Sequence, residues 1–102
     1  MKKHFTKFSE FYPYYIEEHK NKYTKLFHFI GSCLFIYFLL KFLMTYESNN
    51  LLFAFVSAYG LAWISHFFIE KNKPATFDYP IYSFIGDCVM FKEIIKGKHK
   101  IF

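Results

Sequence analysis

Arginine is absent from this 102-residue chain, whose 13 basic side chains are all lysine and whose formal net charge is +5. The planar guanidinium group of arginine is the better reader of phosphates and base edges. Aromatic residues make up 25% of the chain, but they lie inside apolar runs and not between the lysines, as a base-stacking surface requires. The composition therefore argues against nucleic acid as a partner.

Glycine and cysteine are also scarce. The four glycines are scattered along the chain, so there is no glycine-rich loop to cradle a phosphate, and no GxSxG motif marks an acyl hydrolase. The two cysteines, Cys33 and Cys88, have neither CxxC nor zinc-type spacing. We expect both to be small, buried apolar residues with no disulfide between them.

Long apolar runs are abundant instead. Hydrophobic residues make up 54% of the chain, with 16 Phe and 9 Tyr, more than a small soluble domain can readily bury. Two runs, 26–44 and 51–69, are each close to the roughly 20 residues that cross a bilayer core. A short polar turn, 45–50, separates them. The pattern predicts a single all-α domain over residues 1–102, anchored in a membrane by a two-span hairpin.

Two further helices are expected, one on each side of the hairpin. Over 8–20, aromatic residues and His19 share one helical face, which predicts an amphipathic interfacial helix with Ser9 as its N-cap and Pro13 in its first turn. Residues 81–95 are apolar but include three charged side chains. This C-terminal segment is therefore expected to be an interfacial, re-entrant or third spanning helix.

The lysines indicate an orientation. Six precede the first run and six follow the second, whereas the turn between the runs has none. Because cytoplasmic flanks carry excess lysine, both termini are predicted to be cytoplasmic, at the inner membrane of a bacterium or the endoplasmic reticulum of a eukaryote. Membrane lipids are the expected partners. Small residues in 51–69 would also allow a second copy of the chain to pack closely as a homo-oligomer.

Three histidines are the candidate metal ligands: His19, His28 and His66. The predicted topology places all three near the cytoplasmic edge of the membrane, where ionisable groups tend to mark function. Two catalytic candidates accompany them, because Glu70 lies one helical turn after His66 and Asp87 interrupts an apolar stretch. Such a set suits Fe(II) with open positions, although zinc accepts similar ligands. The alternatives are ordinary hydrogen bonds of the histidines to headgroups, a local His66–Glu70 ion pair, and pairing of Asp87 with a lysine.

Two separated motifs resemble the Mpo1-like family. The first is FYPYYIEEH followed by HFIG, over 11–19 and 28–31, and the second is WISHFFIEKNKPA, over 63–75. The similarity continues to Asp87. Ser65 departs from the pattern, since glycine often precedes the third histidine of the family.

The resemblance implies a membrane-bound, Fe(II)-dependent dioxygenase that acts on 2-hydroxy fatty acids with O2. Such an enzyme shortens the acyl chain by one carbon, in fatty-acid α-oxidation. The resemblance carries the metal-ligand role over to His19, His28 and His66. The alternative from a different class is a non-catalytic membrane scaffold or lipid-interacting protein, which the basic flanks and the small-residue face would equally support.

Overall fold

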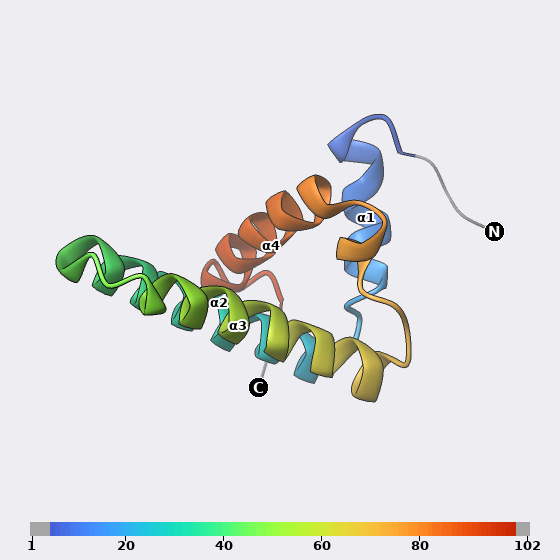
Figure 1. Cartoon of the computed structure of the whole chain (residues 1–102). Coiled ribbons are helices and arrows are strands. Elements are labelled where there is room, and N and C mark those ends of the chain that lie inside the picture. Colours follow the sequence, from blue (N-terminus) through green and yellow to red (C-terminus); the bar gives the residue numbers. More distant parts are fainter. Residues whose placement is uncertain (1–4, 100–102) are drawn as a thin grey trace.

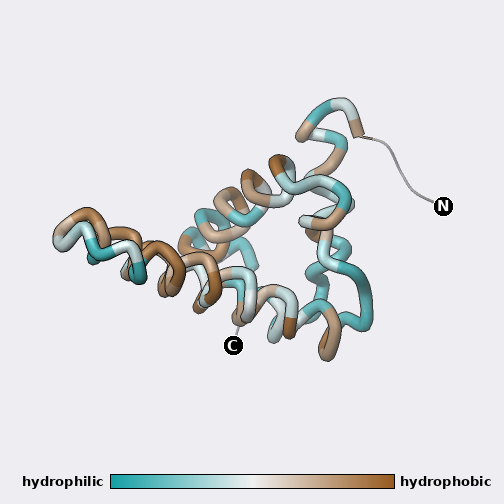
Figure 2. Tube along the Cα trace, in the orientation of Figure 1, coloured by the Kyte–Doolittle hydropathy of each residue, from teal (hydrophilic) through white to brown (hydrophobic). Residues whose placement is uncertain are grey.

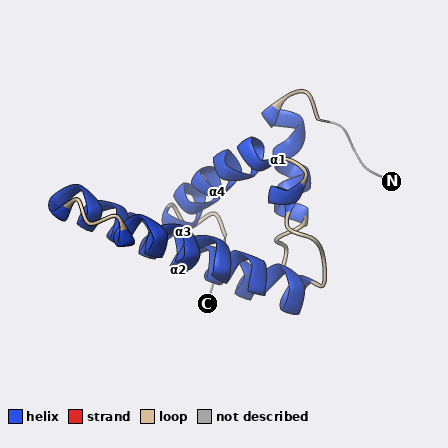
Figure 3. Ribbon diagram, in the orientation of Figure 1, coloured by secondary structure: helices blue, strands red, loops and turns tan. Residues whose placement is uncertain are grey.

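Every regular element in the described part of the chain, residues 5–99, is a helix (Figures 1 and 3). The computed structural model has four main helices, together with a π-helix and a single 3-10 turn. In chain order they are α1 (Phe8–Glu17), α2 (Lys22–Thr45), α3 (Asn49–Ile64), the π-helix η1 (Ser65–Glu70), the 3-10 turn η2 (Ala75–Phe77) and α4 (Pro80–Ile95). The all-α prediction is confirmed for these residues.

The central feature is an antiparallel hairpin of α2 and α3, which lie side by side along their length (Figure 1). Tyr46 ends α2 in the left-handed conformation, with φ of 58°, and the chain reverses at once. Gly31 allows the close approach of the two helices, because a Cβ atom there would lie 3.2 Å from the Cα atom of Ala58. The small-residue face of α3 is therefore used inside the chain, against α2.

Both arms of the hairpin are long and apolar enough to cross a membrane. One span candidate is α2, with 24 residues, and the other is α3 together with η1, with 22 residues and a mean hydropathy of 1.7. Figure 2 shows the apolar colouring along the hairpin. Both helices extend beyond the apolar runs at each end. At the start of α2, for example, the Asn21 side chain accepts a hydrogen bond from the backbone N–H of Tyr23 and so caps the helix five residues before the run begins.

The aromatic face of α1 packs against α4. Phe11 and Tyr15 are fully buried, in one cluster with Met90 and Ile94 of α4. Gly86 leaves room for the Tyr15 ring, which would lie 3.0 Å from a Cβ atom at that position. The aromatic face of α1 is therefore covered by protein, and α1 is held where its C-terminal end meets the hairpin.

Four details differ from expectation. Ser9 does not cap α1, because the helix begins at Phe8 with Lys7 in the cap position, and Pro13 lies inside the helix and not in its first turn. Helix α1 also ends at Glu17, short of residue 20. Cys33 and Cys88 are unpaired as predicted but exposed, since each is on a helix face that the described protein leaves uncovered.

Candidate metal centre

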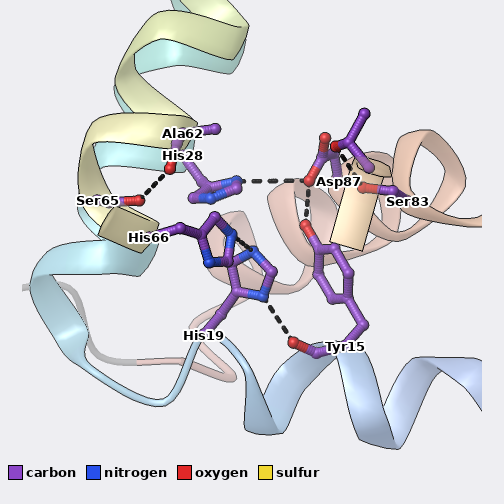
Figure 4. A network of polar contacts seen from close by, with 9 residues as sticks. Tyr15, His19, His28, Ala62, Ser65, His66, Ser83 and Asp87 are labelled. Carbon is purple, nitrogen blue, oxygen red and sulfur yellow. Dashed lines mark hydrogen bonds and ion pairs between the residues drawn. The ribbon is translucent and has the colours of Figure 1, made fainter. Parts of the chain in front are cut away.

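Three histidine rings meet at one point in the structure (Figure 4). The ring centroid of His19 lies 4.3 Å from that of His28 and 4.4 Å from that of His66, and one potential ligand atom from each ring lies within 4.8 Å of the others. Only 1%, 7% and 2% of His19, His28 and His66 are exposed. They come from the α1–α2 connection, α2 and η1, which are far apart in the sequence.

Two of the rings are held through their Nδ1 atoms. His19 Nδ1 lies 2.6 Å from the backbone carbonyl oxygen of Tyr15, and His66 Nδ1 lies 2.7 Å from the amide oxygen of Asn72. The Asn72 amide is oriented by its own NH2 group, which donates to the Glu18 carbonyl. Because both partners can only accept, each Nδ1 must carry the hydrogen. The lone pairs of His19 and His66 are therefore on Nε2.

The third ring faces a carboxylate. His28 Nδ1 lies 3.4 Å from Asp87 Oδ1, which also accepts a hydrogen bond from the Tyr15 hydroxyl (Figure 4). His28 Nε2 is buried and has no hydrogen-bond partner among residues 5–99. A carboxylate beside Nδ1 favours the hydrogen on that atom, so the third lone pair is also on Nε2.

The resulting arrangement calls for a cation. Nε2 of His66 and Nε2 of His19 are 2.9 Å apart, so two lone pairs face each other at hydrogen-bond distance. Metal–nitrogen bonds to histidine are about 2.0–2.1 Å long, which places two ligands of one ion about 3 Å apart at right angles. Burial and the neighbouring His28 and His66 lower the pKa of His19 well below its usual value, which favours the neutral imidazole that binds metals. The donor set fits a metal ion.

Local backbone structure explains how His66 reaches this point. The wide π-helical turn begins at Ser65, whose hydroxyl donates to the Ala62 carbonyl, and ends at Glu70. The next residue, Lys71, is in the left-handed conformation, with φ of 61°. Single π-turns inside helices often mark functional sites. The chain then folds back, so that the backbone N–H of Asn72 donates to the His66 carbonyl at 3.0 Å.

A profile described as "2-hydroxy-palmitic acid dioxygenase Mpo1-like" matches residues 5–99. The chain belongs to the Mpo1-like family. The resemblance seen in its two motifs is thereby confirmed over nearly the whole sequence. Comparison with curated proteins and with solved structures found no significant match.

The two acidic catalytic candidates of this Mpo1-like chain, Asp87 and Glu70, have different surroundings. Asp87 lies beside His28, as described above. Glu70 instead accepts a hydrogen bond from the backbone N–H of Asn21, at 2.7 Å, and so ties the end of η1 to the start of α2. Asn72, not Glu70, takes the Nδ1 hydrogen of His66.

Two residues of the centre were not found from the sequence. Asn72 is six positions after His66, a spacing that matches no helical period, and the second motif contains it without marking it as different from its neighbours. Tyr15 was recognised as part of an aromatic face, but nothing in the sequence showed that its hydroxyl reaches Asp87, 72 residues away.

Proposed function

We propose that this chain is a membrane-embedded, Fe(II)-dependent dioxygenase that acts on 2-hydroxy fatty acids. The observation that carries the proposal is the set of three buried Nε2 atoms with lone pairs directed at one point, each imidazole being fixed from its Nδ1 side. A scaffold has no need of such a donor set, because buried polar atoms are ordinarily paired with each other.

Iron is favoured over zinc by the family description. Three protein ligands leave positions open for other groups, and when bound there, Fe(II) would supply the electron transfer that O2 chemistry requires. Zinc has no redox chemistry. The balanced reaction converts one 2-hydroxy acid and one O2 into the acid shorter by one carbon, CO2 and water.

The substrate head group suits the centre. A 2-hydroxy acid has oxygen donors on two adjacent carbons, which fits a site with adjacent open positions. The positive charge of Lys25 is close enough to His19 to lower the pKa of that imidazole. Lys25 would therefore attract the substrate carboxylate, while Tyr15, Asp87 and Asn72 keep the imidazoles in place.

The surroundings suit an amphiphile. We place α2 and the α3–η1 helix across a bilayer, with both termini on the cytoplasmic side, because the flanking lysines are on that side of the hairpin. The histidines then lie near the polar edge of the membrane. A fatty acid would reach the centre without leaving the lipid.

The test combines metal analysis with turnover. Protein purified without chelators should contain about one iron per chain, take up O2 with a 2-hydroxy fatty acid, and release the carboxyl carbon as CO2. His28→Ala and His66→Ala should lose both iron and O2 uptake. His99→Ala is the matched control, because His99 pairs with Glu93 and not with the cluster.

Two results would count against the enzyme. Full O2 uptake by His66→Ala would remove the centre from the reaction. Protein with no bound iron and no turnover, whose histidine variants behave as the parent does, would leave the membrane scaffold as the better description.

A further inference from the structure

A cavity of about 210 Å³ lies beside the histidine cluster, between α2, α3 and α4. Its polar end is lined by His28, Asp87 and Ser32. The other walls are nearly all apolar, and five large side chains make up most of them: Phe35, Ile36, Phe55, Phe84 and Phe91. The cavity therefore has a polar end at the proposed metal centre and an apolar body.

The cavity runs along the hairpin. Its α2 residues, from His28 through Ser32 to Ile36, recur at helical spacing on one face. Eight residues of α-helix correspond to about 12 Å along the axis. Because α2 runs from the cluster toward the α2–α3 turn, the cavity leads from the histidines toward the middle of the proposed membrane.

The cavity is open on one side. Helix α4 is inclined to the hairpin (Figure 1), and the rings of Phe29 and Phe91 stack at 5.1 Å between α2 and α4. At the rim, Ile36, Phe55 and Phe84 remain 43%, 46% and 47% exposed. These apolar rim residues would face lipid, so the opening admits a hydrocarbon chain and not a polar solute.

We propose that this cavity binds the first part of the acyl tail of a 2-hydroxy fatty acid whose head group lies at the histidine cluster. This inference rests on the proposed function. An apolar cavity of about 150 Å³ takes up benzene, with its six carbons, so the cavity here has room for about eight. The remaining carbons leave through the open side into the lipid.

The geometry sets a dependence on chain length. The tail enters from lipid, which is as apolar as the cavity, so each methylene group gains only packing contacts, and only while the added carbons still enter the cavity. Affinity for ligand already dissolved in the membrane should rise with chain length up to about ten carbons, counting the two head-group carbons, and then become flat.

The first experiment locates the tail. A 2-hydroxy fatty acid with a diazirine on its sixth carbon is added to the full chain in phospholipid vesicles, irradiated, and the labelled residues are identified by mass spectrometry. Label on the cavity segments around Phe35, Phe55 and Phe84 is expected. Label only on outward residues such as Tyr37 or Val56 would overturn the proposal.

The second experiment blocks the cavity. Ser32→Phe places a ring in its polar half and should abolish the rise of affinity with chain length, measured by competition with the photoprobe. Cys33→Phe is the matched control, since Cys33 is the next residue of α2 but is exposed and does not line the cavity. Its length dependence should equal that of the parent. Equal profiles for the two variants would contradict the proposal.

A variant that keeps the test valid if Ser32→Phe does not fold is Phe84→Ala, which widens the cavity at its rim. In the plot of affinity against acyl chain length, this variant should move the flat part to longer chains.

The outcomes also separate the two proposals. Cavity labelling without turnover or iron leaves the tail site and removes the dioxygenase, whereas turnover with label elsewhere does the reverse.

Discussion

Asn72 holds His66 by two hydrogen bonds at once. Its backbone N–H donates to the His66 carbonyl at 3.0 Å, and its side-chain oxygen accepts from His66 Nδ1 at 2.7 Å. The backbone bond fixes the position of Asn72 and the side-chain bond fixes the imidazole. The orientation of one proposed metal ligand thus depends on a residue outside its helix.

Replacing Asn72 should weaken metal binding more than it weakens the fold. Asn72→Leu removes the acceptor for the imidazole, and loss of such an outer partner typically costs about 10–100-fold in metal affinity. Asn72→Asp keeps an acceptor and should retain affinity. Iron affinity is measured by competition with a chelator. Equal affinities for the two variants would show that Asn72 does not orient the ligand.

The hydroxyl of Tyr15 should contribute to stability. Tyr15 is fully buried and its hydroxyl donates to Asp87. Tyr15→Phe removes this bond to a charged acceptor and should lower the free energy of unfolding by roughly 1.5–3 kcal/mol. Chemical unfolding in detergent measures it. Tyr37→Phe, at an exposed position of α2, is the control and is expected to change stability by less than about 0.5 kcal/mol. If Tyr37→Phe destabilised the chain as much as Tyr15→Phe, the loss could not be assigned to the hydrogen bond with Asp87.

Two glycine substitutions should have opposite effects. A Cβ atom at Gly86 would lie 3.0 Å from the Tyr15 ring, whereas at Gly60 it meets no atom within 4 Å. Gly86→Ala should destabilise by about 1–3 kcal/mol through overpacking, and should also reduce iron affinity, because Tyr15 must move. Gly60→Ala should stabilise α3 by about 0.5–1 kcal/mol. Thermal unfolding of the two variants tests whether one loses and the other gains stability, and metal analysis tests whether only Gly86→Ala loses iron.

Glu93 should make part of the stability depend on acid pH. The hydrogen bond from Tyr12, at 2.6 Å, lowers the pKa of the Glu93 carboxyl, and His99 adds to the effect, although partial burial opposes it. Since this pKa is lower in the folded chain than in the unfolded chain, the contribution is present above the ordinary value of 4.5. It is lost as pH falls through the lowered value.

Glu93→Gln should therefore flatten the acid limb of the stability curve. The free energy of unfolding is compared for variant and parent from neutral pH down to below the ordinary glutamate pKa. Glu47→Gln, in the exposed α2–α3 turn, serves as the control. If Glu93→Gln left the stability at acid pH unchanged, Glu93 would not be the source of this pH dependence.

The helices of this chain were predictable, because apolar runs of bilayer length and aromatic residues at helical spacing are local signals. The shared depth of His28 and His66 followed from the antiparallel hairpin. What could not be predicted are the contacts that depend on the folded backbone. The π-helical turn is the clearest case, since it directs Glu70 to Asn21 and leaves the His66 imidazole to Asn72. Helical periodicity had paired Glu70 with His66 instead.

The same turn makes this part of the chain sensitive to length and tolerant of composition. Phe67 and Phe68, on its outer side, are exposed, so other apolar residues can replace them. Deleting either one would convert the wide turn into an ordinary α-helical turn and rotate the residues beyond it by about 100° relative to His66. The hydrogen bond between Asn21 and Glu70 and the one between His66 and Asn72 would both be lost. Homologous chains should therefore vary freely in residue type here but keep the residue count unchanged.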